Sequence, residues 1–340
     1  MNKFILALFQ RKHKLKSTTL FQVLIGRRTT SVLSYAYFND LLPLFGSFPK
    51  LTEATFDQIL RELSQEGWID AIPGEPKYYQ LLKQEPVLNY PTFHQLDYFR
   101  FGKKEKEVWR LIQFIVQVAS YLGKEKDYLP IESSPYHLAR TRYFVQQHKE
   151  HLQARIYEEL VVLFQLLSKE QAELLSHTLT GYQQNGAAFF QLLSEEYQEF
   201  PLEKLAISNS IHAFLAKLEE KKDFLLYQFV AEILLENQNK SAVLSRTLFQ
   251  QGLDLEEIGQ QRRLKSGTLH DHFIEWAISD DQFPFQAFLN PKHQTIFNQL
   301  PKASWNQPYK TLGLPKELSF FELRLYQIQE KRGRKCSNKH

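Results

Sequence analysis

Apolar residues recur with helical spacing through the middle of the chain, residues 101–238. Side chains three and four positions apart share one face of a helix, so each set forms a stripe that packs on a core. Two stripes stand on either side of a loop at 123–135, and three more follow at 187–197, 211–218 and 224–235. The pattern predicts a bundle of roughly five or six helices. The first stripe is Val108, Leu111, Ile112, Ile115, Val118 and Ala119, and the second is Ile156, Leu160, Leu163, Phe164 and Leu167.

The first hundred residues predict a different arrangement. An apolar helix is expected over 30–45, ending near Gly46, and Thr52 is a suitable N-cap for a second helix that ends at Gly67. Residues 68–69 and 78–82 flank the turn sequence PGEP, which is typical of a hairpin. Helix, helix and hairpin together predict a winged-helix-like domain over 1–100, preceded by a basic arm. The exposed face of its second helix carries Glu53, Asp57, Arg61, Glu62 and Gln65, which favours a protein contact or an architectural role over DNA reading.

The segment 241–278, SAVLSRTLFQQGLDLEEIGQQRRLKSGTLHDHFIEWAI, has the spacing of a helix-turn-helix. The first helix ends at Gly252, and Asp254 with Glu257 has the pattern of a capping box for the second. Gly259 is the small residue expected to let a third helix approach, and Leu264 fills the turn. We expect the third helix to begin near Lys265 or Ser266. The residues expected to be buried are Val243, Leu244, Thr247 and Leu248 in the first helix, Leu255 and Ile258 in the second, and Leu269, Phe273, Trp276 and Ala277 in the third.

The turn before the third helix carries three cations, Arg262, Arg263 and Lys265. Cations beside the free backbone amides of a helix N-terminus suit a phosphate, so we expect contact with DNA phosphate or with an acidic partner surface. Ser266, Thr268, His270 and Asp271 are expected to face outward, the first three as further contacts. Asp271 and Glu275 oppose a phosphate contact, and the alternative is a protein-docking module with the same fold.

Basic residues also gather at the two ends of the chain. Residues 1–30 contain seven Lys or Arg and no acid, among them Arg27 and Arg28. Residues 331–340 form a basic tail with Lys331, Arg332, Arg334, Lys335 and Lys339. Each cluster is either a phosphate footprint or a solvated arm. The aromatic residues near the N-terminal cations offer stacking surfaces for bases, although a core role is favoured for them; they are Tyr35, Tyr37, Phe38, Tyr78, Tyr79, Tyr98, Phe99 and Phe101.

Several stretches resemble known families. TLFQQG, EEIGQQRRLKSGTLHDHF and the closing FFELR at 320–324 look like the helicase-associated helix-turn-helix domain at the C-termini of some RecQ helicases, and like the YpbB family of Gram-positive bacteria. The match to the YpbB family covers more, because it includes Gly26-Arg27-Arg28-Thr29 and the winged-helix-like region. This resemblance implies an accessory protein encoded beside a RecQ-type helicase and acting with it. One departure is Arg263, at a turn position where glycine is frequent because it favours a positive φ.

Composition and charge limit the class of protein. With 43% apolar residues, 13 Gly and 14 Pro, the chain is globular, and its net charge of +4 is too small to demonstrate a polyanionic partner. Cys336 is the single cysteine, so a disulfide or a thiolate metal cluster within one chain is excluded and a reducing compartment is expected. Residues 4–9 are too short for a signal-peptide core, and there is no apolar run of about 20 residues. We expect a soluble cytoplasmic protein without a membrane partner.

Motifs for catalysis or cofactor binding are missing from the sequence. Gly102-Lys103 and Gly123-Lys124 do not continue into the Ser or Thr of a phosphate-binding loop, so any motor must come from another chain. His270 and His272 are two positions apart, which points their imidazoles away from each other. We therefore expect no enzyme activity, no cofactor, no metal and no small-molecule substrate.

The combined expectation is a mainly α, multidomain adaptor with boundaries at 1–100, 101–238, 239–330 and a tail at 331–340. It would act with a RecQ-type helicase in DNA repair or recombination, with DNA contact possible. The alternative is a helix-turn-helix transcription regulator, for which homodimers and palindromic sites are expected.

Overall fold

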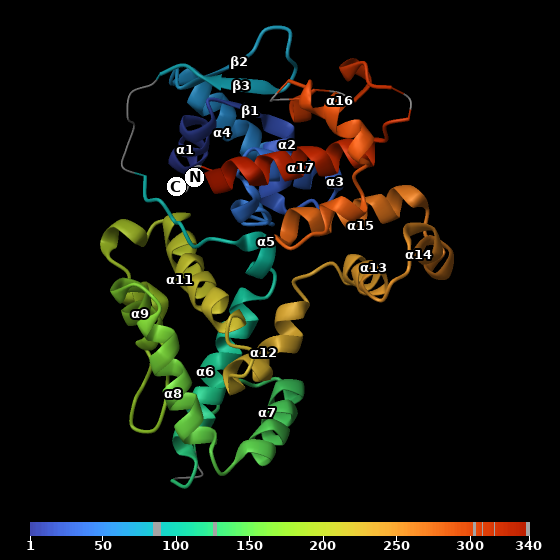
Figure 1. Ribbon diagram of the computed structural model, residues 1–340. Helices are drawn as coiled ribbons and strands as arrows, with labels where there is room; N and C mark the ends of the chain where they lie inside the picture. The colour runs from blue at the N-terminus through green and yellow to red at the C-terminus, as the bar shows by residue number, and fades with distance from the viewer. Residues whose placement is uncertain (84–89, 125–127, 302–303, 308, 316, 338–340) are drawn as a thin grey trace. The chain divides into compact units, whose positions relative to one another are not determined.

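The computed structural model describes residues 1–83, 90–124, 128–301, 304–307, 309–315 and 317–337. The protein is mainly helical with one small sheet (Figure 1), as predicted. It divides into two compact units, and neither is continuous in sequence. The first unit consists of residues 1–17 and 43–237, and the second of residues 18–42 and 238–340. This division differs from the expected boundaries at 100 and 330, because 18–42 group with the C-terminal part.

The first unit begins with helix α1 (Asn2–Lys12), strand β1 (Lys14–Lys16), helix α4 (Glu53–Gln65) and strands β2 (Ile69–Ala71) and β3 (Tyr78–Leu81). The strands form an antiparallel sheet in the order β1-β3-β2, with Leu15 opposite Tyr79 and Ile69 opposite Leu81. The hairpin and its preceding helix are confirmed. The Thr52 hydroxyl accepts the Thr55 backbone N–H at 3.2 Å and so caps α4, as expected.

Two features of this region differ from the expectation. Residues 4–9 of α1 are all buried, so the N-terminus is a core helix of the unit and not a basic arm. The expected helix at 30–45 ends at Phe38 as α3 (Thr30–Phe38), is followed by the short turn η1 (Leu42–Leu44), and lies in the second unit. Within the first unit, α1 therefore packs beside α4 where the 30–45 helix was expected.

The rest of the first unit is the helical bundle. Its helices are α5 (Tyr98–Phe101), α6 (Glu105–Tyr121), α7 (Pro135–His148), α8 (Leu152–Gln165), α9 (Lys169–Ser176), α10 (Phe189–Leu192), α11 (Leu202–Glu219) and α12 (Leu225–Leu235), with a single turn η2 (Glu195–Tyr197). The predicted stripes of α6 and α8 lie in or against one apolar core, except Val118, which is half-buried outside it. The prediction of one packed helix at 187–197 is wrong: only the short elements α10 and η2 form there, and neither has a buried residue.

The second unit joins two N-terminal helices to the C-terminal part of the chain. Helices α2 (Ser17–Ile25) and α3 accompany α13 (Lys240–Gln250), α14 (Leu255–Arg262), α15 (Ser266–Ser279), α16 (Gln294–Asn298) and α17 (Phe320–Ser337). Short turns η3 (Phe285–Ala287), η4 (Pro291–His293), η5 (Ser304–Asn306) and η6 (Tyr309–Leu312) connect α15 to α17. Helix α15 packs against α3, α13, α14 and α17, so it is the central helix of this unit. Among the described residues, no helix combines the length and apolar character needed to cross a bilayer.

Candidate nucleic-acid interface

The helix-turn-helix consists of α13, α14 and α15. Asp254 Oδ1 accepts the Glu257 N–H at 2.8 Å, and Glu257 Oε2 accepts the Asp254 N–H at 2.9 Å, which confirms the predicted capping box. Arg263 ends α14 in the left-handed region, at φ 53° and ψ 42°. The Leu264 N–H then bonds to the Gly259 carbonyl at 2.9 Å and turns the chain into α15. The turn therefore places a non-glycine residue in the positive-φ conformation that its position requires.

The core of this domain agrees with the prediction in α15, agrees in part in α14 and differs in α13. Ile258 and the four residues predicted for α15 are buried, while Leu255 is only partly buried. In α13 the buried residues are Ala242 and Ser245, while Leu244 is 49% exposed. A Cβ added to Gly259 would meet only the Leu264 carbonyl oxygen at 3.6 Å, an ordinary contact, so the close helix approach assigned to this glycine is not needed.

Arg262 faces into the domain, which corrects the expectation that it is presented to a partner. Its guanidinium donates to the Ser241 carbonyl at 2.7 Å, to the Ser241 hydroxyl at 2.8 Å and to the Ser245 hydroxyl. Burial lowers its pKa. Arg262 lies four positions after buried Ile258, on the same helix face, a spacing that already indicates an inward side chain. The residue joins the end of α14 to the start of α13.

The two histidines of α15 also have internal partners. The His272 Nδ1 atom lies 2.9 Å from the Ser245 hydroxyl, and the His270 ring stacks on Phe321 of α17 with centroids 4.3 Å apart. Burial is the main cause of the lowered pKa of both rings. His270 is half-buried by this stacking, so it is a poor contact for a partner. In the described part of the chain, no three His, Cys, Asp or Glu side chains are grouped as metal ligands.

The two acids of α15 meet the N-terminal segment of the second unit, a contact that sequence reasoning missed. The Glu275 carboxylate accepts two N–H groups of Arg28, at 3.0 and 2.7 Å, and the Asn239 amide at 3.1 Å. The Thr30 hydroxyl donates to Asp271 at 2.5 Å. Arg28, proposed as a phosphate contact, is therefore engaged in an ion pair, and the acids expected to repel phosphate are bonded within the unit.

The exposed part of the turn is a small basic surface, which we call the cationic corner: Arg263, Lys265, Ser266 and Thr268, all exposed. Lys265 occupies the N-cap position of α15, and its side chain does not cap the amides of the first helical turn. Those amides and the two cations favour an anion at this point. Arg27 is exposed as well. Four of the five predicted contacts at 263–270 thus lie together at the surface.

The predicted basic tail is largely part of α17, which extends to Ser337. The Lys331 ammonium bonds to the carbonyls of Tyr37 and Phe38 at 2.7 and 2.8 Å and pairs with Asp40 at 2.8 Å. Arg332 bonds to the Ala277 carbonyl. These two cations stabilise the second unit and are not a free phosphate footprint. The side chains of Arg334, Lys335 and Cys336, and residue Lys339, lie outside the described residues.

Comparisons with known proteins agree with this geometry. A family model described as a helix-turn-helix domain matches residues 241–327. Protein YpbB of Bacillus subtilis (strain 168) is 19% identical over 319 residues, which cover 91% of each chain. No solved structure matches the chain significantly. The chain is therefore similar to YpbB over nearly its whole length and carries a helix-turn-helix domain near its C-terminus.

Proposed function

We propose that the protein is a non-enzymatic adaptor that binds DNA through the cationic corner and acts with a RecQ-type helicase in DNA repair or recombination. The observation that carries the DNA contact is the exposure of Arg263 and Lys265 beside the uncapped N-terminus of α15. The helicase partnership rests on the resemblance to the YpbB family and to the helicase-associated domain of some RecQ proteins. The matched helix-turn-helix model and the YpbB similarity support the DNA contact.

The burial of α15 favours an adaptor over a regulator that reads a base sequence. A recognition helix contacts base edges along one exposed face. Eight residues of α15, from Leu269 to Ile278, are buried, and Asp271 bonds to Thr30. The remaining exposed residues of α15 are those of its first turn and Ser279 at its end, so we propose contacts to phosphates with little selection among bases.

DNA binding is tested by fluorescence anisotropy with labelled duplex and forked DNA over a salt titration. Arg263→Glu with Lys265→Glu is expected to abolish most of the binding, because two favourable charges become repulsive. Lys292→Glu with Lys310→Glu is the matched control, since it makes the same charge change at exposed positions of the second unit. Equal affinities of the two double variants would overturn the assignment of the corner.

The helicase partnership is tested by co-purification with a RecQ-type helicase, with and without nuclease. Retention after nuclease treatment supports a direct protein contact, and loss of the helicase under both conditions contradicts the adaptor. Enrichment of one discrete sequence from random duplex DNA at physiological salt would favour a transcription regulator.

A further inference from the structure

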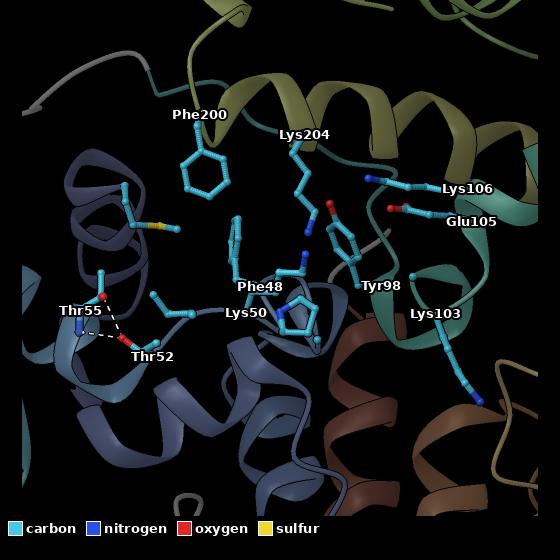
Figure 2. Close-up of a pocket in the computed structure, with 15 residues that line it drawn as sticks. Phe48, Lys50, Thr52, Thr55, Tyr98, Lys103, Glu105, Lys106, Phe200 and Lys204 are labelled. Atoms are coloured by element: carbon cyan, nitrogen blue, oxygen red, sulfur yellow. Dashed lines mark hydrogen bonds between the residues drawn. The ribbon is translucent and has the colours of Figure 1, made fainter.

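A pocket in the first unit has aromatic and cationic walls (Figure 2). Its volume is about 560 Å³, which is within the range that small ligands occupy. The segment before α4, the region of α5 and the start of α11 supply its lining. All of these belong to residues 1–17 and 43–237, so the pocket lies entirely inside one compact unit.

Three aromatic rings form its apolar walls. Phe48 is buried and meets Phe200 edge-on with centroids 5.7 Å apart, while Phe200 is 61% exposed. Tyr98 is fixed by the bond from its hydroxyl to Ser208 at 2.8 Å. A Cβ on Gly102 would come within 2.6 Å of the Tyr98 ring, so glycine at this position is required for the ring to lie where it does. The rings are therefore held in place before any ligand arrives.

Lysine side chains enter the same space. Figure 2 shows the amino groups of Lys50, Lys106 and Lys204 pointing towards Tyr98. The Lys204 ammonium lies 5.1 Å from the centroid of Phe48 and 5.5 Å from that of Tyr98, and it donates to the Ser47 carbonyl. Within the described residues no carboxylate lies in ion-pair distance of it, and burial lowers its pKa. An anion in the pocket would supply the charge partner that this ammonium lacks.

The one acidic side chain in the lining, Glu105, lies against His212, and its charge opposes the lowering of the Lys204 pKa by burial. It is 4% exposed, and its carboxylate oxygen lies 2.7 Å from His212 Nε2. Lys103 also lines the pocket, but its ammonium donates to the Glu236 carbonyl at 3.0 Å, and its side chain points away in Figure 2. The ligand thus meets three inward ammonium groups and three rings.

We propose that this pocket binds a nucleotide of single-stranded DNA or RNA, with the base stacked on the exposed ring of Phe200 and the phosphates on Lys50, Lys106 and Lys204. A nucleotide carries a flat ring and an anion a few bonds apart, which matches the adjoining rings and ammonium groups. Single-strand binders use this combination of stacking and charge. The site goes beyond the proposed duplex contact at the cationic corner and lies in the other unit.

The test uses the full chain and a labelled oligothymidine of about ten residues, a length typical of one single-strand site. Phe200→Ala is expected to weaken binding at least about fivefold, the lower end of what one stacked base contributes. Phe190→Ala is the matched control, because Phe190 is 60% exposed and lies outside the pocket lining. Both rings are more than half exposed, so both variants are expected to fold, and circular dichroism of each checks this. Equal affinities of the two variants would overturn the proposal.

The phosphate contact is tested separately by salt dependence. Lys50→Gln with Lys106→Gln is expected to reduce the slope of log K against log salt by about 1.4, at about 0.7 for each lost single-strand contact. Lys103→Gln is the control on the same rim and should leave the slope unchanged. A slope that does not differ between the double variant and the control contradicts the charge assignment.

Photocrosslinking separates this site from the cationic corner. An oligonucleotide with 5-iododeoxyuridine should crosslink to peptides containing Phe48, Tyr98 or Phe200, and should still do so in the Arg263→Glu, Lys265→Glu variant. Crosslinks confined to the second unit would overturn the pocket while leaving the proposed function standing. Binding of an acidic, aromatic peptide that Phe200→Ala abolishes, with no oligonucleotide binding, would instead assign the pocket to a protein ligand.

Discussion

Replacing Glu275 with alanine is expected to lower the free energy of unfolding of the helix-turn-helix by about 2 kcal/mol. Its side chain is 11% exposed and that of Arg28 is 30% exposed, so this ion pair is intermediate between a fully buried pair and an exposed one. Breaking a fully buried pair costs about 3–5 kcal/mol, and an exposed pair contributes about 0.2–1 kcal/mol. The change also leaves the Asn239 amide without its carboxylate acceptor.

Hydrogen–deuterium exchange of the full chain measures this loss, because the two units need not unfold together. A loss of about 2 kcal/mol corresponds to roughly 30-fold faster exchange of α15 amides. Peptides from α6, in the first unit, provide the internal reference. Glu256→Ala is the control substitution: this acid is exposed on α14 and accepts only a 3.3 Å bond from Gln260, so it should change stability by less than about 0.5 kcal/mol.

A double-mutant cycle decides whether the ion pair itself is responsible. Arg28→Ala, Glu275→Ala and the double variant should give a coupling energy of about 1–2 kcal/mol. The inference that Arg28 stabilises the helix-turn-helix through Glu275 is refuted if the stability losses of the two single variants simply add. It is also refuted if the α15 amides exchange no faster in Glu275→Ala than in Glu256→Ala.

Three further changes in the second unit have expected outcomes. Asp254→Ala removes the capping box and should lower the unfolding free energy by about 1 kcal/mol, measured by chemical denaturation; an unchanged midpoint contradicts this. Arg263→Gly relieves the left-handed backbone and should stabilise the unit by about 0.5–1 kcal/mol while weakening duplex binding, so a lower melting temperature would be evidence against strain at this turn. The pKa of His272 is lowered in the folded protein, chiefly by burial and then by Arg262, so the unfolded state binds its proton more readily. Stability should therefore be full above the ordinary value of 6.5 and fall as pH drops below it, and His272→Asn should flatten this slope in thermal unfolding. An equally steep slope in that variant would show that His272 does not cause the loss of stability at low pH.

Features that depend on neighbouring residues were predictable from the sequence. The Thr52 cap and the Asp254–Glu257 capping box join residues three positions apart, so their spacing alone indicates them. The turn at Arg263 was also predictable from local sequence, because the positive φ that the turn requires concerns the backbone of a single residue. The exposure of Arg263 and Lys265 follows from this local geometry.

Features that depend on distant partners were not predictable. Ser245 is a polar residue, and its burial in place of Leu244 is stabilised by bonds with Arg262 and His272 that no periodicity reveals. Arg28 and Glu275 are separated by 247 positions. A sequence pattern shows that a charge is present but not which charge it meets after folding. The pocket was unpredictable for the same reason, since Phe48, Tyr98 and Lys204 come from three separate stretches of the chain.

The second unit assembles from two stretches that leave the ribosome far apart in time. Residues 18–42 are synthesised before the 195 residues 43–237, and the helices they pack with follow only afterwards. At about 5–20 residues per second this delay is roughly 10–40 s. During that interval helix α3 lacks α15, against which it packs, so nascent chains are expected to depend on chaperone protection at this point more than finished molecules do.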